Sequence, residues 1–572
     1  MHVATTILLL LFITALSNLL ARLLRLLRLP VPLPLLQIGL GTAASLLGVH
    51  VAFEPDVFML LFIPPLLFAD AYLMPMREFL ELKRIILMLA LGLVLFTTIG
   101  CGYFIHWLIP AMPIAACFAL AAVLSPTDAV AVSGMIEGRA VPHRFMHILS
   151  GEALLNDASG LVCFKFAATA AVTGTFSLWH ATGAFVLMSL AGVAVGAVLA
   201  MALVLTERWL IGRASENSTI VVTISALLPF AAYLAAEHLD ASGILAAVAA
   251  GITLKQRRMF GATRTETRLQ AEAVWSLLTF AFNGLIFLLL GLQLPSLLRG
   301  GIALARTAEI SPWLLLLGIV EITSVLVLLR LAWISFSLLL RWATAGPGRT
   351  GTGASPTPPP RPSVWLVGAT SVAGVRGAIT LAAVLSLGSD FPERDLLVTL
   401  AAGVIVASLG LAALTLPALL RGIAIPDSDP MQSEAGRARL ALAQLATQAV
   451  EHEMLAPDAE ERTRGWSTER EEVLSRLLDE FRARAQRLHV ALDPNAADDD
   501  ERLPALRRHR METAIRLHVL RIGRDRLARM IRSNEINDQT ERLLVRELDH
   551  EEEVLLATAR SLPRDIGMTD DR

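Results

Sequence analysis

The chain has 572 residues, of which 55% are hydrophobic and only 17% are charged. Soluble globular proteins rarely reach that apolar share, because most of their surface must meet water, so the composition excludes an ordinary soluble fold. The formal net charge of −2 gives no reason to expect a nucleic-acid partner, and the three cysteines indicate neither a disulfide framework nor a metal framework.

The predicted elements are membrane-spanning helices. Apolar stretches recur from Thr6 to about Leu420, each about 20 residues long and therefore able to cross a hydrocarbon core about 30 Å thick. The fold class that we predict is an all-α polytopic membrane protein with about thirteen spans. In chain order the spans are 5–22, 31–50, 56–74, 84–107, 113–137, 146–172, 178–206, 217–237, 241–255, 272–294, 312–340, 364–388 and 395–421.

The loops between these spans differ in charge. Arginine and lysine gather in the loops that follow odd-numbered spans, whereas the even-numbered loops hold only Arg299, Arg306 and Arg394. Because cytoplasmic loops carry the excess of positive charge, the odd-numbered loops are predicted to be cytoplasmic. This places the N-terminus outside and the C-terminus in the cytoplasm, in a multi-pass protein of the cell membrane.

The number of spans also predicts an internal symmetry and a domain boundary. Thirteen spans divide as six, one and six, and two halves separated by one helix have opposite orientations, as in inverted-repeat transporters. We therefore predict a transmembrane domain over residues 1–425. Residues 426–572 are richly charged with apolar residues at helical spacing, which predicts a cytoplasmic helical tail domain, either passive or regulatory.

Three charged residues fall near the middle of the predicted spans. With a rise of about 1.5 Å per residue, Asp128 lies roughly 22 Å, Asp157 roughly 16 Å and Arg376 roughly 18 Å into their helices. A charge at that depth costs about 2.5–3.5 kcal/mol, and such residues typically mark an ion pathway.

The stretch "LSPTDAVAV" indicates a broken fifth helix. Pro126 lacks an N–H, so the helix is expected to kink or unwind just before Asp128. The freed carbonyl groups, the Thr127 hydroxyl and the Asp128 carboxylate would offer oxygen ligands, which hard cations such as Na⁺ prefer. The alternative is an ordinary proline kink with a structural aspartate. Glycines on both sides of Arg376 predict a second break, in helix twelve.

Helix six carries a second polar group. Glu152 and Asn156 lie four residues apart and so share a helical face, which makes Asn156 the expected hydrogen-bond partner of Glu152. Arg376 is the expected counter-charge of Glu152. The pair would be either a buried structural clamp or a direct participant in transport.

Asp157 is the best candidate for an exchanging group. A buried carboxylate is costly to leave charged and unpaired, so it can hold either a proton or a metal cation. Asp70, in the third span, would act either as part of an ion funnel or structurally at a helix end. Lys165 would extend toward the outer interface, or alternatively balance charge near the pathway.

The motifs "LSPTDAVAV", "GEALLNDASG" and "VAGVRGAITLA", in this order, resemble the NhaP/NHE-type monovalent cation–proton antiporters, as does "PPLLFADAYLMP". The resemblance covers about residues 5–420. It implies thirteen helices in an inverted repeat, unwound helices five and twelve that cross, a moving core domain and a homodimer.

Carried over by motif, the resemblance implies that Asp157, Asp128 and Thr127 bind the transported Na⁺. It implies that Glu152 and Arg376 form a structural pair.

The asparagine at Asn156 stands where electrogenic relatives carry a second aspartate, which implies electroneutral exchange. The sequence departs from the family at Ala153, where some members have a coordinating serine, and at Lys165.

We therefore predict a secondary active antiporter that exchanges Na⁺, Li⁺ or K⁺ for H⁺ by alternating access. Its substrates are a monovalent cation and the proton, it lies in membrane lipid, and no cofactor or nucleic acid is expected. A cation channel is one alternative, although no re-entrant filter segment is evident. An intramembrane aspartyl protease that uses Asp128 and Asp157 is the other, and would make the protein an enzyme.

Overall fold

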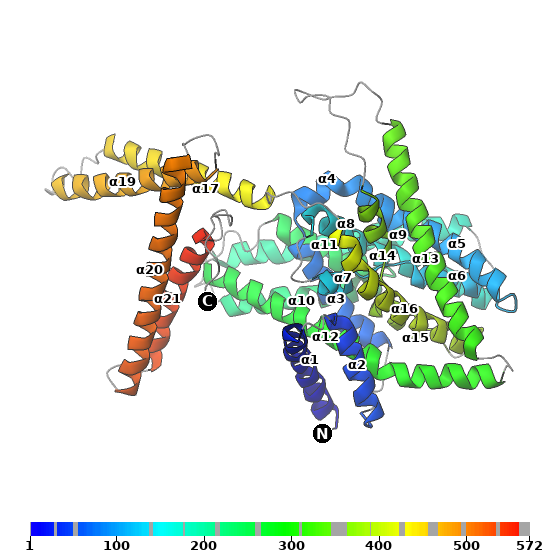
Figure 1. Cartoon of the computed structure of the whole chain (residues 1–572). Helices are drawn as coiled ribbons and strands as arrows, with labels where there is room; N and C mark the ends of the chain where they lie inside the picture. Colours follow the sequence, from blue (N-terminus) through cyan, green and yellow to red (C-terminus); the bar gives the residue numbers. More distant parts are fainter. Residues whose placement is uncertain are drawn as a thin grey trace. The chain divides into compact units, whose positions relative to one another are not determined.

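The structure is a computed structural model. It describes residues 2–27, 31–49, 55–136, 141–174, 178–211, 218–257, 265–307, 312–344, 363–388, 391–422, 430–455, 467–492, 499–533 and 538–559. Regular structure over these ranges is helical, and no strand occurs in them (Figure 1).

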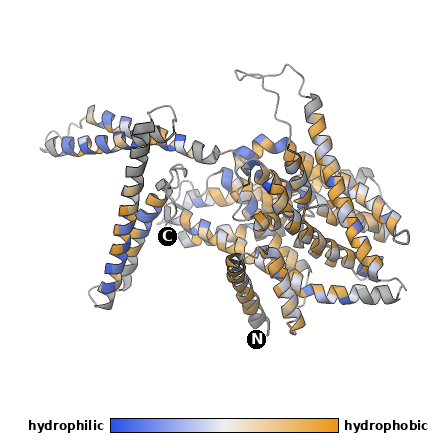
Figure 2. Ribbon diagram, in the orientation of Figure 1, coloured by the Kyte–Doolittle hydropathy of each residue, from blue (hydrophilic) through white to orange (hydrophobic). Residues whose placement is uncertain are grey.

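The chain divides into two compact units, Met1–Ile425 and Pro426–Arg572. The division coincides with the change from apolar to charged composition. In the second unit, α17 packs against α19 and α20 packs against α21. Hydrophilic and hydrophobic residues alternate along these helices, unlike the largely hydrophobic helices of the first unit (Figure 2). The second-unit helices are α17 Pro430–Leu455, α19 Ser467–Leu492, α20 Asp499–Arg532 and α21 Asp538–Ala559.

The first unit contains a helix, or a set of helices, at each predicted span. In chain order they are α1 His2–Leu26, α2 Leu33–Leu46, α3 Pro55–Leu73, α4 Met76–Leu87, the π-helical turn Met88–Leu93, α5 Val94–Leu108, α6 Ile114–Leu124, α7 Ala129–Ile136, α8 His143–Thr173, α9 Leu178–Ile211, α10 Ser218–Glu237, α11 Gly243–Gln256, α12 Thr265–Thr307, α13 Pro312–Thr344, α14 Val364–Val372, α15 Ala378–Leu385 and α16 Arg394–Arg421.

Length and composition identify the clearest membrane spans among the described residues. Six continuous helices qualify, and the bent pair α6–α7 would make a seventh. Other apolar helices, such as α2 and α11, are shorter. The polytopic helical fold is thus confirmed, whereas the count of thirteen spans and the inverted repeat remain predictions.

Both predicted helix breaks are present. Helices α6 and α7 meet at an angle of 42° across residues 125–128, and α14 and α15 are separated by residues 373–377. The two breaks cross each other: the backbone N–H of Asp128 donates to the Val375 carbonyl at 2.8 Å, and the Thr380 hydroxyl donates to the Val123 carbonyl at 3.0 Å. Freed backbone groups of one broken helix are therefore satisfied by the other, as a low-dielectric interior requires.

Helix α6 lies at the centre of the largest hydrophobic core. Its alanines Ala116, Ala119, Ala121 and Ala122 have no exposed surface, and α5 and α8 pack against it. A helix that is apolar on every side is expected to be buried on every side. This burial brings the break after α6 into the interior of the first unit.

Helices α2 and α12 approach each other closely through glycines. A Cβ atom at Gly41 would lie 2.2 Å from the Leu288 carbonyl oxygen, and one at Gly291 would lie 2.1 Å from the Ile38 carbonyl oxygen. Small residues permit such backbone contact between membrane helices. The two helices therefore form one tightly packed pair.

Candidate cation-binding site

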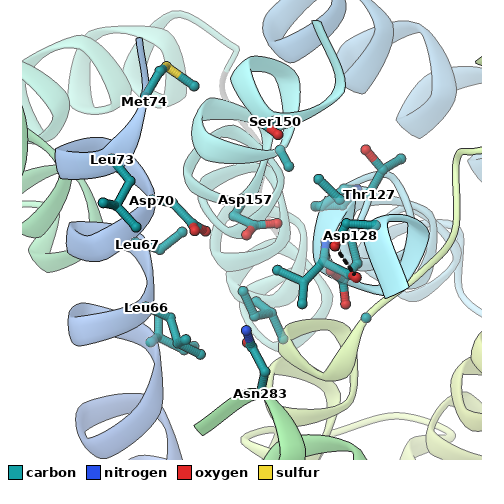
Figure 3. A pocket seen from close by; sticks show the side chains of 18 of the residues that line it. Leu66, Leu67, Asp70, Leu73, Met74, Thr127, Asp128, Ser150, Asp157 and Asn283 are labelled. Carbon is teal, nitrogen blue, oxygen red and sulfur yellow. Dashed lines mark hydrogen bonds between the residues drawn. The ribbon is translucent and has the colours of Figure 1, made fainter. Parts of the chain in front are cut away.

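A cavity of about 300 Å³ lies between α3, the break of α6–α7, α8, α12 and α15. Its lining includes three carboxylates, Asp70, Asp128 and Asp157, which come from three different elements. Figure 3 shows Asp70 and Asp157 facing each other across it, with Asp128 on the far side of Asp157 and Asn283 on a further wall. The fold thus brings the predicted residues Asp128 and Asp157 to one place and adds Asp70 to them.

Asp128 is held by the helix that follows it. Its Oδ1 accepts hydrogen bonds from the backbone N–H groups of Val130 at 2.8 Å and Ala131 at 3.1 Å, so it caps the N-terminus of α7. Its other oxygen lies against the start of α15, because a Cβ atom at Gly377 would be 2.4 Å from Oδ2. The N-terminal ends of two half-helices therefore stabilise a negative charge at Asp128.

Asp157 has no such partner. Its side chain is only 8% exposed, and within the described part of the chain it makes neither a hydrogen bond nor an ion pair. The side chain of Asp70, on α3, makes none within these ranges either. Two facing, largely buried carboxylates without a counter-charge repel each other, which disfavours ionisation of both unless a cation or a proton lies between them.

Thr127, Asn156 and Glu152 form a buried chain of hydrogen bonds. The Asn156 amide donates to the Thr127 hydroxyl at 2.9 Å, and that hydroxyl donates to Glu152 Oε1 at 3.0 Å. Asn156 therefore reaches Glu152 through Thr127, and the prediction of a direct Asn156–Glu152 bond is wrong. Thr127 lines the cavity, but its hydroxyl already makes these two hydrogen bonds, with Asn156 and with Glu152.

The counter-charge of Glu152 is Arg330, on α13, so the predicted Glu152–Arg376 clamp is wrong. Arg330 donates through both terminal nitrogens to the two carboxylate oxygens, at 2.7 Å for the Nη2–Oε2 bond. Its Nε also donates to the Thr370 carbonyl at 2.9 Å, near the end of α14. Both partners are almost completely buried, and a two-pronged arginine–carboxylate pair is among the strongest arrangements for buried charges.

Arg376 instead binds backbone carbonyl groups. Its Nε donates to the carbonyl of Leu124, the last residue of α6, at 2.6 Å, and its Nη1 donates to the Gly374 carbonyl. Its backbone N–H donates to the Ser408 hydroxyl at 3.2 Å. The guanidinium thus compensates the negative C-terminal end of α6, while Asp128 compensates the positive end of α7.

Lys165 lies outside the cavity. Its side chain is 59% exposed, and its Nζ is 4.0 Å from Glu237 Oε2, at the end of α10. An exposed pair at this distance contributes little to stability. The residue does not line the cavity, so the alternative of charge balance beside the pathway finds no support.

Two site residues were missed by sequence reasoning. Arg330 stands alone in "VLVLLRLAWIS", inside a predicted span, and an isolated intramembrane charge is itself a signal. Asn283, in "FAFNGLIFLLL", is a polar residue in an equally apolar run, and it lines the cavity.

The cavity reaches the protein surface at one end. Ser133 and Ser150 line it and are exposed, and Met74 and Pro75, at the α3–α4 turn, line the same end. The flanking loops are those whose arginines and lysines predict a cytoplasmic location.

The chain is similar to known proteins both in sequence and in fold. A family model described as "Sodium/hydrogen exchanger, transmembrane" matches residues 8–422. The Escherichia coli (strain K12) protein named "Uncharacterized Na(+)/H(+) exchanger YjcE" is 39% identical, over 97% of this chain and 99% of its own. The "Sodium, potassium, lithium and rubidium/H(+) antiporter" of Bacillus pumilus is 35% identical, over 98% of this chain and 79% of its own. Among solved structures, the sodium proton antiporter MjNhaP1 from Methanocaldococcus jannaschii covers 74% of this chain and 99% of its own, with a TM-score of 0.54 at 16% identity, which shows a shared fold.

Proposed function

The chain belongs to the sodium/hydrogen exchanger family, and from that premise we propose that Asp157 holds in turn the two ions that the protein exchanges. Members of this family are secondary antiporters and not enzymes, so the channel and protease alternatives are set aside. The observation that carries the proposal is the Asp157 carboxylate, which is buried, faces the cavity and has no hydrogen-bond partner in the described chain.

The neighbouring carboxylates explain why only one ion is held at a time. Asp128 accepts hydrogen bonds from two backbone N–H groups, which favour its charged form, whereas Asp157 and Asp70 have no such donor within the described residues. A cation at Asp157 would gain from all three negative charges, and a proton at Asp157 would remove one of them. Binding of either ion therefore weakens binding of the other, which is the coupling that an antiporter needs.

We extend the proposal to the transported cation, the stoichiometry of exchange, the oligomeric state and the location of the protein. An alkali cation is the transported partner, since relatives are named for sodium, potassium, lithium and rubidium. Exchange is electroneutral, as the resemblance to the family implies for a chain with the neutral Asn156 beside Asp157; the Asn156 amide donates to Thr127, which donates to Glu152. The protein acts as a homodimer in the cell membrane, with its N-terminus outside and its C-terminus in the cytoplasm. Residues 1–425 carry out the exchange and residues 426–572 form the cytoplasmic tail.

The cavity corresponds to an inward-open state. It reaches the surface beside Ser133 and Ser150, at the end that the loop charges predict to be cytoplasmic. At its other end it is lined by buried Ile63 and Phe287. Ile63 lies seven residues before Asp70 along α3, or about 10 Å at a helical rise. Alternating access would open this apolar end and close the other.

The test is Asp157→Asn, measured as cation-dependent dequenching of a pH dye in inverted vesicles with Na⁺, Li⁺ and K⁺ in turn. We expect exchange to be abolished for every cation, with folding retained in detergent. The matched control is Asp395→Asn, which alters a 76%-exposed aspartate away from the cavity and should leave exchange unchanged. Wild-type turnover in Asp157→Asn would refute the proposal.

A further inference from the structure

Helix α12 presents one polar side chain to the cavity. Asn283, Ile286 and Phe287 line it from this helix, at the spacing of one turn, and only Asn283 carries oxygen and nitrogen atoms in its side chain. Figure 3 shows the Asn283 amide directed into the cavity, from a wall that carries none of the three carboxylates.

The amide of Asn283 has no hydrogen-bond partner in the part of the chain that the structure describes. Asn283 is partly buried, and withdrawing an amide from water without a partner costs free energy, so a wall that only sealed the cavity would be expected to be apolar here. The two apolar neighbours, Ile286 and Phe287, show what such a wall looks like. A ligand in the cavity would supply the missing partner.

The chemistry of an amide oxygen complements that of a carboxylate. A carboxylate binds either a proton or a cation, so a change in its charge or its surroundings alters both affinities. A neutral carbonyl oxygen coordinates an alkali cation but takes no proton in the accessible pH range. Ala153, which also lines the cavity, offers no side-chain oxygen. A neutral ligand would thus raise cation affinity without changing proton affinity.

We propose that Asn283 is a neutral oxygen ligand of the transported cation, presented by α12 opposite Asp157. This inference rests on the proposed function, since it assigns a ligand to the same site. Helix α12 is locked to α2 through Gly41 and Gly291, whereas Asp157 lies on α8. Because the two groups stand on different helices, movement of α8 against the α2–α12 pair makes or breaks this contact, and the ligand belongs to one state of the cycle.

The experiment compares Asn283→Leu, which removes the polar atoms and keeps the branching of the side chain, and Asn283→Ala with wild type in inverted vesicles. We expect the half-saturating Na⁺ concentration to rise roughly three- to tenfold, the effect of losing one hydrogen-bond-strength contact. The maximal rate, and its pH dependence at saturating Na⁺, should stay as in wild type. The rise in half-saturating concentration should be larger for Li⁺ than for K⁺, because the smaller ion depends more on each ligand that replaces a water molecule of its hydration shell.

Controls separate this inference from the function on which it rests. Ser296→Ala, on an exposed face of the same helix, should change nothing. Unchanged half-saturation in both Asn283 variants would overturn the inference, as would equal shifts of half-saturation and pH profile, which indicate a general distortion. Active exchange by Asp157→Asn would instead overturn the proposed function, whatever Asn283 does. If one Asn283 variant does not fold, the other decides the question.

Discussion

At the scale of single residues, the buried charges find partners of two different kinds. Glu152 is paired with the opposite charge of Arg330 through two hydrogen bonds, whereas the guanidinium of Arg376 donates hydrogen bonds to the carbonyl groups of Leu124 and Gly374. Removing one member of a buried ion pair leaves the other charge uncompensated, which costs more than the pair itself contributes. The two arginines should therefore respond differently to the loss of Glu152.

We predict that Glu152→Gln lowers the free energy of unfolding by about 3–5 kcal/mol, because Arg330 is left as an unpaired buried charge. The double variant Glu152→Gln/Arg330→Met should recover part of this loss. Melting temperature in detergent, read by size-exclusion fluorescence, measures the effect.

The comparison variant is Glu152→Gln/Arg376→Met. It leaves the Arg330 charge unpaired and also exposes the carbonyl end of α6, so it should be less stable than either single variant. The structure pairs Glu152 with Arg330. A melting temperature that recovers in this variant, and does not recover in the variant that removes Arg330, would contradict that pairing.

At the scale of elements, the site depends on how closely the two broken helices cross. Gly377 stands at the start of α15, where an added Cβ would lie 2.4 Å from Asp128 Oδ2 and 2.9 Å from its Cγ. Real Cβ atoms do not approach so closely, and Asp128 cannot move without losing its bonds to Val130 and Ala131. The crossing therefore requires glycine at this position.

We predict that Gly377→Ala strongly reduces exchange and lowers the melting temperature, because the two half-helix ends must separate. The matched control is Gly410→Ala in α16, where an added Cβ meets nothing within 4 Å. That substitution should preserve activity and stabilise the helix by up to about 1 kcal/mol. Normal exchange in Gly377→Ala would show that the crossing tolerates a side chain, and the argument from close approach would then fail.

These elements also show which features a sequence can predict. Helix positions follow from apolar runs and the α6–α7 break follows from Pro126, because both are local properties of the chain. The partner of Glu152 is not local: Arg330 lies 178 residues away, and both arginines stand in apolar spans. Helical periodicity predicts which face of a helix is buried but not which helix covers it. The same reason explains why Asn283 was missed, since only the packing of α12 brings it to the aspartates.

At the scale of the whole molecule, the cavity connects the site to the protein surface at one end. Its exposed end lies between the α3–α4 turn and the start of α8, and its other end is lined by buried apolar residues. An antiporter must open to one side at a time, because a pathway open at both ends would dissipate the gradients that it couples. If the loop charges set the orientation as predicted, the accessible end is the cytoplasmic one, as in the inward-open state proposed above.

We predict that Ser150→Cys is modified by a membrane-impermeant maleimide in inverted vesicles and protected in intact cells. Ser150 is exposed at the mouth of the cavity, near loops whose positive charge predicts the cytoplasm. Ala111→Cys, exposed in the loop between α5 and α6, should show the opposite pattern because that loop is predicted to face outward. Background labelling of native cysteines should be low, since Cys101 and Cys117 are buried, and Cys163 can be replaced by alanine. Labelling of both positions from the same side would contradict the alternation of loops, and labelling of Ser150→Cys only from outside would reverse the orientation.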